Sequence, residues 1–127
     1  MARIYLLAAG VHDGPKDFRH RLLAAGHSVH VPQSTEAEHN TLLEHPIEYP
    51  IGLAAIAEER RVMSWADTCI LLVPALPYGF LVSGWFIGAG KRSILVHDHL
   101  KLTAWDQLFT DFANNTDEAL QMLEGDR

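Results

Sequence analysis

The chain has 127 residues, of which 48% are hydrophobic, and a formal net charge of −6 at pH 7. This length supports one hydrophobic core, so we expect a single domain over residues 1–127. The acidic balance comes without a block of Lys or Arg, which argues against a nucleic-acid partner, and no apolar run approaches the roughly 18 residues that span a membrane. The single cysteine, Cys69, lies in an apolar run. We therefore expect a buried, inert thiol and a cytoplasmic protein.

The N-terminal part of the chain predicts a strand, a helix and a second strand. Residues 3–9 are continuously apolar and lead into a glycine, as in a buried strand followed by a turn. Phe18, Leu22 and Leu23 share one face of a helix predicted over residues 16–25. Residues 27–32 alternate polar and apolar side chains, which favours an edge strand.

A long irregular stretch, residues 33–50, separates this unit from a second predicted helix that begins at Ile51. Connections of that length are usually mobile or functional. On the following helix we expect Glu58 and Glu59 to face solvent or to pair with nearby arginines. The apolar residues that recur there at helical spacing are Leu53, Ile56, Ala57 and Met63.

The central segment carries the strongest structural signal. It predicts a buried strand over residues 67–74, a turn-rich loop over 75–80, a short helix over 81–89 and a second buried strand over 93–96. The run 70–73 has no polar alternation, so both faces of that strand must be covered. Such strands are typical of a parallel sheet between two layers of helices.

The C-terminal part predicts a fifth strand over residues 108–113 and a last helix. Asn115 followed by Glu118 resembles a capping box at the start of that helix. Its apolar stripe consists of Ala119, Leu120 and Leu123.

Five strands that alternate with helices predict an α/β fold: a three-layer, doubly wound, flavodoxin-like parallel sheet. We expect the strand order 2-1-3-4-5, because the first, third and fourth runs are the most continuously apolar and should be central. Ligands of such sheets bind over the carboxyl ends of the strands, at the point where the order reverses. That point brings residues 9–13 beside residues 74–79, across one crevice.

The candidate ligand contacts lie around this crevice. Pro77, Tyr78 and Gly79 can shape a wall, and Tyr78 can stack on a base. Ser83 and the free N–H groups of the helix start can receive a phosphate or carboxylate. The competing interpretation is a tightly packed helix whose glycines only allow close approach to the sheet. The expected ligand-binding residues are Tyr5, Ala9, Gly10, Pro77, Tyr78, Gly79, Ser83 and Gly84.

Two further groups of polar residues can carry chemistry. Asp13 follows the first strand and is the best-placed general acid or base, although an acidic residue before Gly-Pro is also a common turn former. His97 and His99 can share one face with His12 nearby, as in a chelating site for a transition metal. Since no regular ligand motif accompanies them, we predict a solvated loop, no metal and no cofactor.

Four segments match the pattern of one known family in the right order. They are residues 3–10 (RIYLLAAG), 23–29 (LAAGHSV), 66–67 (AD) and 84–91 (GWFIGAGK). With these segments the chain resembles the nucleoside 2-deoxyribosyltransferase-like superfamily, which includes nucleotide N-glycosidases, over nearly its whole length. The family pattern opens with Ile-Tyr-Leu-Ala-Gly-Pro and carries Glu-x-Gly-Tyr-Ala ahead of a Gly-Lys pair.

One departure from that pattern bears on activity. Gly84 takes the place of the family glycine, and Val82 stands where the resemblance places the nucleophilic glutamate. In that chemistry a carboxylate attacks the anomeric carbon, because an oxocarbenium-like transition state needs a fixed negative charge or a covalent partner. Valine supplies neither. The resemblance thus implies binding of a nucleoside, nucleotide or sugar phosphate, with the usual glycosyl transfer absent or severely impaired.

Two other functions stay open. The first is a diverged N-glycosidase or deoxyribosyltransferase that uses Asp13 or a loop carboxylate such as Glu48. The second is a non-catalytic, oligomeric interaction module. Trp85 and Phe86 on the short helix favour association, and the resembling family is oligomeric, so we expect a homo-oligomer in which a neighbouring subunit can complete the site.

Overall fold

The computed structural model describes residues 1–8, 13–32, 50–73, 77–97 and 104–125. Five parallel strands form one sheet in the order β2-β1-β3-β4-β5, which confirms the predicted order. The strands are β1 (Arg3–Ala8), β2 (Ser28–His30), β3 (Thr68–Leu72), β4 (Arg92–Val96) and β5 (Asp111–Ala113).

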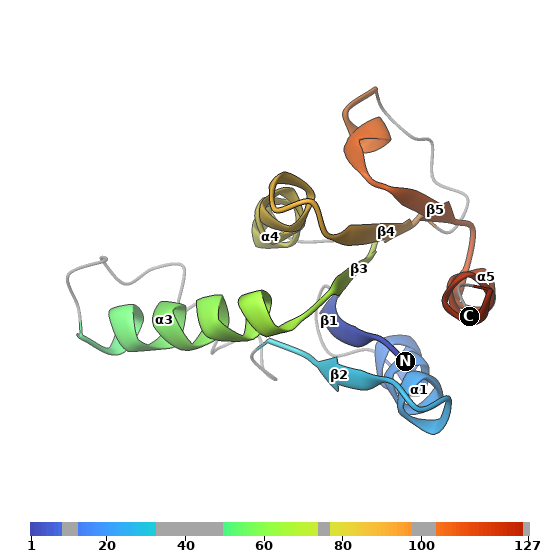
Figure 1. The fold of residues 1–127 in the computed structure, drawn as a ribbon, viewed down its shortest axis with the longest axis horizontal. Coiled ribbons are helices and arrows are strands. Elements are labelled where there is room, and N and C mark those ends of the chain that lie inside the picture. Colours follow the sequence, from blue (N-terminus) through green and yellow to red (C-terminus); the bar gives the residue numbers. More distant parts are fainter. Residues whose placement is uncertain (9–12, 33–49, 74–76, 98–103, 126–127) are drawn as a thin grey trace.

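Helices cover both faces of the sheet, so the fold is a flavodoxin-like α/β sandwich (Figure 1). One face carries α3 (Pro50–Trp65) and α4 (Pro77–Gly88), and the other carries α1 (Asp13–Ala24) and α5 (Thr116–Glu124). A short 3₁₀ helix, η1 (Ala104–Leu108), precedes β5. No helix in these described ranges is long and apolar enough to cross a membrane.

Two apolar clusters, one on each face of the sheet, make up the core. The strands contribute alternate residues to the two clusters because successive side chains of a strand point to opposite faces. The cluster under α1 and α5 includes Ile4, Leu6, Ile70, Leu72, Ile94, Val96, Phe18, Leu22, Leu120 and Leu123. The cluster under α3 and α4 includes Tyr5, Leu7, Cys69, Leu71, Leu95, Val62, Ala66, Phe86 and Phe109.

Several predicted boundaries were wrong: α1 begins at Asp13 and not at residue 16, and β2 covers only Ser28–His30. Residues 77–79, predicted as part of a loop, form the first turn of α4, since proline is tolerated at the first position of a helix, where its missing N–H has no intrahelical partner. The fifth strand is shorter than predicted and begins at Asp111, because η1 occupies residues 104–108. The predicted cap of the last helix is confirmed: Asn115 precedes α5, and its side-chain oxygen accepts a hydrogen bond of 2.8 Å from the N–H of Glu118.

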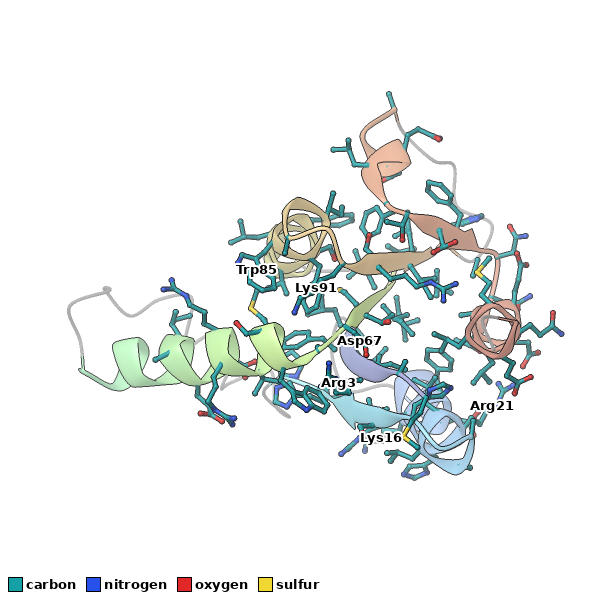
Figure 2. All side chains as sticks on the ribbon, in the orientation of Figure 1. Arg3, Lys16, Arg21, Asp67, Trp85 and Lys91 are labelled. Atoms are coloured by element: carbon teal, nitrogen blue, oxygen red, sulfur yellow. The ribbon has the colours of Figure 1, made fainter. Side chains whose placement is uncertain are left out.

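Asp67 ties the amino ends of β3 and β1 together. Its carboxylate accepts a hydrogen bond of 3.1 Å from the N–H of Arg3, and its own N–H donates to the carbonyl of Arg3 at 2.9 Å. Figure 2 shows the two side chains close together. As expected from the sequence, Asp67 lies at the amino end of β3. This end of the sheet is opposite the carboxyl ends of the strands.

The side chain of Lys91 caps the C-terminal end of α3. Its ammonium group donates to the carbonyls of Met63 (3.0 Å), Ser64 (2.9 Å) and Ala66 (2.6 Å). The same nitrogen lies 5.4 Å from the ring centroid of Trp85, and Figure 2 shows both residues near the end of α3. A cation here satisfies carbonyls that lack intrahelical donors and complements the negative end of the helix dipole.

We expect Lys91→Met to lower the free energy of unfolding by about 2–3 kcal/mol, because three carbonyls lose a charged donor. Urea denaturation followed by circular dichroism measures the change. Lys16→Met, on the exposed face of α1, is the matched control and should shift stability by less than about 0.5 kcal/mol. Equal effects of the two substitutions would contradict this role of Lys91.

Candidate functional site

The carboxyl ends of the central strands meet at one edge of the sheet. Ala8 of β1 pairs with Leu72 of β3, which pairs with Val96 of β4. Helix α4 begins at Pro77, shortly after β3 ends. The ends of the first and third strands therefore lie side by side, as the strand order predicted.

A polar cluster lies between β1, β2 and α3, on the face of the sheet that α3 and α4 cover. The hydroxyl of Tyr5 donates a hydrogen bond to Oε2 of Glu59. Nε2 of His30 lies 3.2 Å from the same oxygen. The rings of Tyr5 and His30 are in contact, with centroids 5.2 Å apart, and Phe86 lies on Tyr5 with centroids 5.6 Å apart. We call Tyr5, Glu59 and His30 the Glu59 cluster.

The local structure explains why these three side chains meet. Tyr5 and His30 are register partners in the β1–β2 pair, so their side chains stand next to each other on one face. Glu59 precedes Val62 by three residues and Ala66 by seven, so it belongs to the helical stripe that packs against the sheet. The prediction that Glu59 faces solvent or pairs with arginine was wrong. Glu58 does behave that way: it is exposed and bonds Arg61 at 2.6 Å.

The cluster has a buried end and an open end. Tyr5 is fully buried, while the side chains of Glu59 and His30 are 16% and 30% exposed. Both donors act on Oε2. Among the described residues Oε1 has no hydrogen-bond partner, so it is the free acceptor of this carboxylate.

Glu59 is held in its ionised form. Burial raises the pKa of its carboxyl group, but the hydrogen bonds from His30 and Tyr5, together with the charge of His30, outweigh burial and bring the pKa below the usual 4.5. A half-buried, ionised carboxylate with one free oxygen accepts hydrogen bonds from hydroxyl or amino groups and repels anions.

The lowered pKa of Glu59 predicts a pH-dependent contribution to stability. A depressed carboxyl pKa stabilises the fold above about pH 4.5, and this contribution is lost as the pH falls through the folded value. We therefore expect the difference in the free energy of unfolding between wild type and Glu59→Gln to become smaller as the pH is lowered from about 7 to about 3. Urea denaturation at each pH measures this difference. A difference that does not vary with pH would contradict the assignment.

The residues of α4 that follow its first turn divide between the core and the surface. Val82 is half-buried, and its hydrocarbon side chain packs against the cluster that contains Tyr5 and Phe86. Ser83 is fully buried and its hydroxyl donates to the carbonyl of Gly79 at 2.8 Å. Gly84 lies on the exposed side of α4.

Buried groups of α4 and β3 are unreactive or structural. Cys69 lies 3.7 Å from the Ser83 hydroxyl and is buried, as expected, and burial raises the pKa of its thiol to about 12. Phe86, expected to promote association, is fully buried in the core instead. Trp85 keeps 37% of its surface exposed.

Several predicted site residues are not placed. Ala9, Gly10, His12, Glu48 and His99 lie outside the described residues. The side chains of Asp13, Pro77 and Tyr78 are likewise not described, so their predicted roles, like those of Ser83 and Gly84, stay predictions. His97 directly follows β4, and its ring Nδ1 is buried without a hydrogen-bond partner in the described part of the chain, where no group of three metal-ligating side chains occurs.

Comparison with solved structures shows which known proteins share this fold. A 2-deoxyribosyltransferase from the psychrotolerant bacterium Bacillus psychrosaccharolyticus superposes with a TM-score of 0.66 at 16% identity, over 93% of this chain and 90% of that chain. The chain has the nucleoside 2-deoxyribosyltransferase-like fold. A CMP N-glycosidase from Clostridium botulinum shares this fold, with a TM-score of 0.55 at 17% identity over 96% of this chain and 98% of that one. No protein-family model and no curated protein matches the sequence.

The nucleoside 2-deoxyribosyltransferase-like fold confirms the resemblance inferred from the four sequence segments at the level of architecture. Those segments include the strand that carries Tyr5 and the Gly-Lys pair that ends at Lys91. The Glu59 cluster was found only from the structure. Its sequence signal is the spacing Glu59, Val62, Met63 and Ala66, which is one face of a helix.

Proposed function

We propose that this chain binds a nucleoside or nucleotide at the carboxyl edge of its sheet, on the side of α3 and α4. The observation that carries the proposal is the Glu59 cluster: an ionised, half-buried carboxylate held by Tyr5 and His30 beside an apolar core. Two proteins of the same fold are named as a 2-deoxyribosyltransferase and a CMP N-glycosidase, which supports this class of ligand.

The chemistry of Glu59 suits the uncharged part of such a ligand. Sugar hydroxyls and the amino groups of bases donate hydrogen bonds, and a carboxylate accepts them strongly. A phosphate next to the same carboxylate is repelled. The phosphate of a nucleotide then belongs near the start of α4, whose free N–H groups and positive dipole end favour an anion.

We propose that glycosyl transfer through a carboxylate on α4 is absent. Val82 has a hydrocarbon side chain packed against the core, and it can neither attack an anomeric carbon nor stabilise positive charge there. Binding without this reaction is the function that the arrangement supports best.

A thermal-shift series tests the binding proposal. Cytidine, CMP, adenosine, AMP and ribose 5-phosphate are added separately, and at least one should raise the unfolding temperature progressively with concentration, because a ligand selective for the folded state stabilises it. Folded wild-type protein that shows no shift with any of the five compounds would contradict the proposal.

A second candidate function is N-glycosidic cleavage by another carboxylate. Contact with the Tyr5 hydroxyl favours Glu59 for this role, since a paired donor and acceptor can move a proton. Release of free base from CMP is followed by chromatography. Activity that Glu59→Gln removes assigns the reaction to Glu59, activity that only Asp13→Asn removes assigns it to Asp13, and no release supports binding alone.

We also propose a cytoplasmic homo-oligomer. Helix α4 contains no charged residue, and its exposed side chains include Leu81 (77%) and Trp85 (37%). A helix that is apolar all round is usually buried, and a neighbouring copy can cover it. Light scattering after gel filtration should give more than one chain per particle. A monomer at all concentrations would contradict self-association.

A further inference from the structure

The two donors of the Glu59 cluster converge on one atom. Tyr5 Oη and His30 Nε2 both hydrogen-bond to Oε2 of Glu59, and neither hydrogen-bonds to Oε1. Tyr5 approaches from the buried end and His30 from the open end, where its side chain is 30% exposed. The carboxylate is thus fixed by one oxygen, which determines the direction in which the other oxygen points.

We propose that His30 is a positioning residue of the ligand site: with Tyr5 it anchors Oε2 of Glu59, so that Oε1 is presented to a hydroxyl or amino group of the ligand. This inference rests on the proposed nucleoside-binding function and specifies which atom makes the contact. Through Glu59 His30 then affects affinity, although its own ring need not touch the ligand.

The surroundings of His30 support a positioning role over simple packing. β2 is an edge strand, and α1 covers its other face, where Val29 and Val31 pack against the core. On the face of His30, the titratable groups that the described part of the chain places near it include Tyr5 from β1 and Glu58 and Glu59 from α3. Glu58 is exposed and bonded to Arg61, so Glu59 is the carboxylate that His30 holds.

His30 also contributes to the charge state of Glu59. Its hydrogen bond and its charge both lower the pKa of the Glu59 carboxyl group and oppose the effect of burial. Without His30, Glu59 keeps the same burial and retains only the Tyr5 donor. The lowered pKa of Glu59 therefore depends on His30 as well as on Tyr5.

Two substitutions separate positioning from packing. His30→Gln retains an N–H donor that can replace Nε2, whereas His30→Phe retains a ring without a donor. The matched controls are His20→Gln and His20→Phe, on the exposed face of α1. Each variant is measured in two ways: the carboxyl ¹³C titration of Glu59 by NMR without ligand, and the affinity for cytidine and CMP by calorimetry at neutral pH.

We expect His30→Phe to raise the pKa of Glu59 that the NMR titration measures. The same substitution should weaken cytidine binding about tenfold, because a hydrogen bond to a charged group contributes that much to the affinity. His30→Gln should restore most of the affinity, and both His20 variants should match wild type. Equal losses in the Gln and Phe variants, or an unchanged Glu59 titration in His30→Phe, would overturn the positioning role.

The two readouts distinguish failure of the inference from failure of the proposed function. Wild-type protein that binds none of the five compounds of the thermal-shift series contradicts the proposed function, and the ligand role of His30 fails with it. Wild-type protein that binds while His30→Phe binds equally well contradicts the role of His30 alone.

Discussion

Replacing Glu59 with glutamine is expected to weaken binding of cytidine or CMP by about 10- to 100-fold, because a hydrogen bond to an ionised group contributes about 1.5–3 kcal/mol. The substitution preserves the shape of the side chain and removes its charge. Glu59 is the carboxylate that Tyr5 and His30 hold on the α3 side of the sheet. Isothermal titration calorimetry at neutral pH measures the change in Kd.

The adjacent residue provides the control for Glu59. Glu58→Gln removes a charge one position away on the same helix, from a side chain that is exposed and bonded to Arg61. It should leave the Kd within about twofold of wild type, because exposed charges contribute little. Loss of affinity in both variants would indicate a general effect of charge on α3 and would contradict a specific role of Glu59.

Phe86→Ala is expected to lower the free energy of unfolding by about 3–5 kcal/mol, the usual effect of removing a fully buried ring. Phe86 is completely buried between α4 and the sheet. Its ring lies 5.6 Å from that of Tyr5, so the substitution also removes support for the Glu59 cluster. Chemical denaturation gives the stability, and calorimetry on the folded variant gives the accompanying loss of affinity.

Trp85→Ala is the matched comparison for Phe86→Ala. Trp85 is the preceding residue of α4, packs edge-on against Phe86 with centroids 5.2 Å apart, and is 37% exposed. The loss in the free energy of unfolding should stay below about 2 kcal/mol, since less apolar surface is removed from the core. A larger effect for Trp85 than for Phe86 would contradict the packing described here.

The parts of the fold that depend on continuous apolar runs were predictable from the sequence. β1, β3 and β4 are central because their residues are buried on both faces, and this pattern also set the strand order. The start of α4 was not predicted, because Pro77 and Gly79 are turn residues by local preference and nothing in that preference shows that a helix follows immediately. Local sequence likewise does not show where η1 ends and β5 begins.

The candidate site was predictable only in part. Tyr5 was expected at the site from its position in the first strand, but Glu59 and His30 were not. The apolar residues Ile56 and Ala57 suggested the wrong buried face for α3. In the structure Ile56 is 45% exposed, and the helix extends away from the sheet toward its N-terminal end (Figure 1). Which turn of a helix meets the sheet is set by tertiary packing, and periodicity alone does not determine it.

The most direct test is to follow backbone amide shifts by ¹⁵N NMR while CMP is added to the wild-type protein. We predict that the largest changes occur at Tyr5, His30 and Glu59 and at the carboxyl ends of β1, β3 and β4, and that Glu59→Gln greatly reduces them. Changes confined to α1 and α5, or to the opposite edge around Asp67, would contradict a nucleotide site beneath α3 and α4.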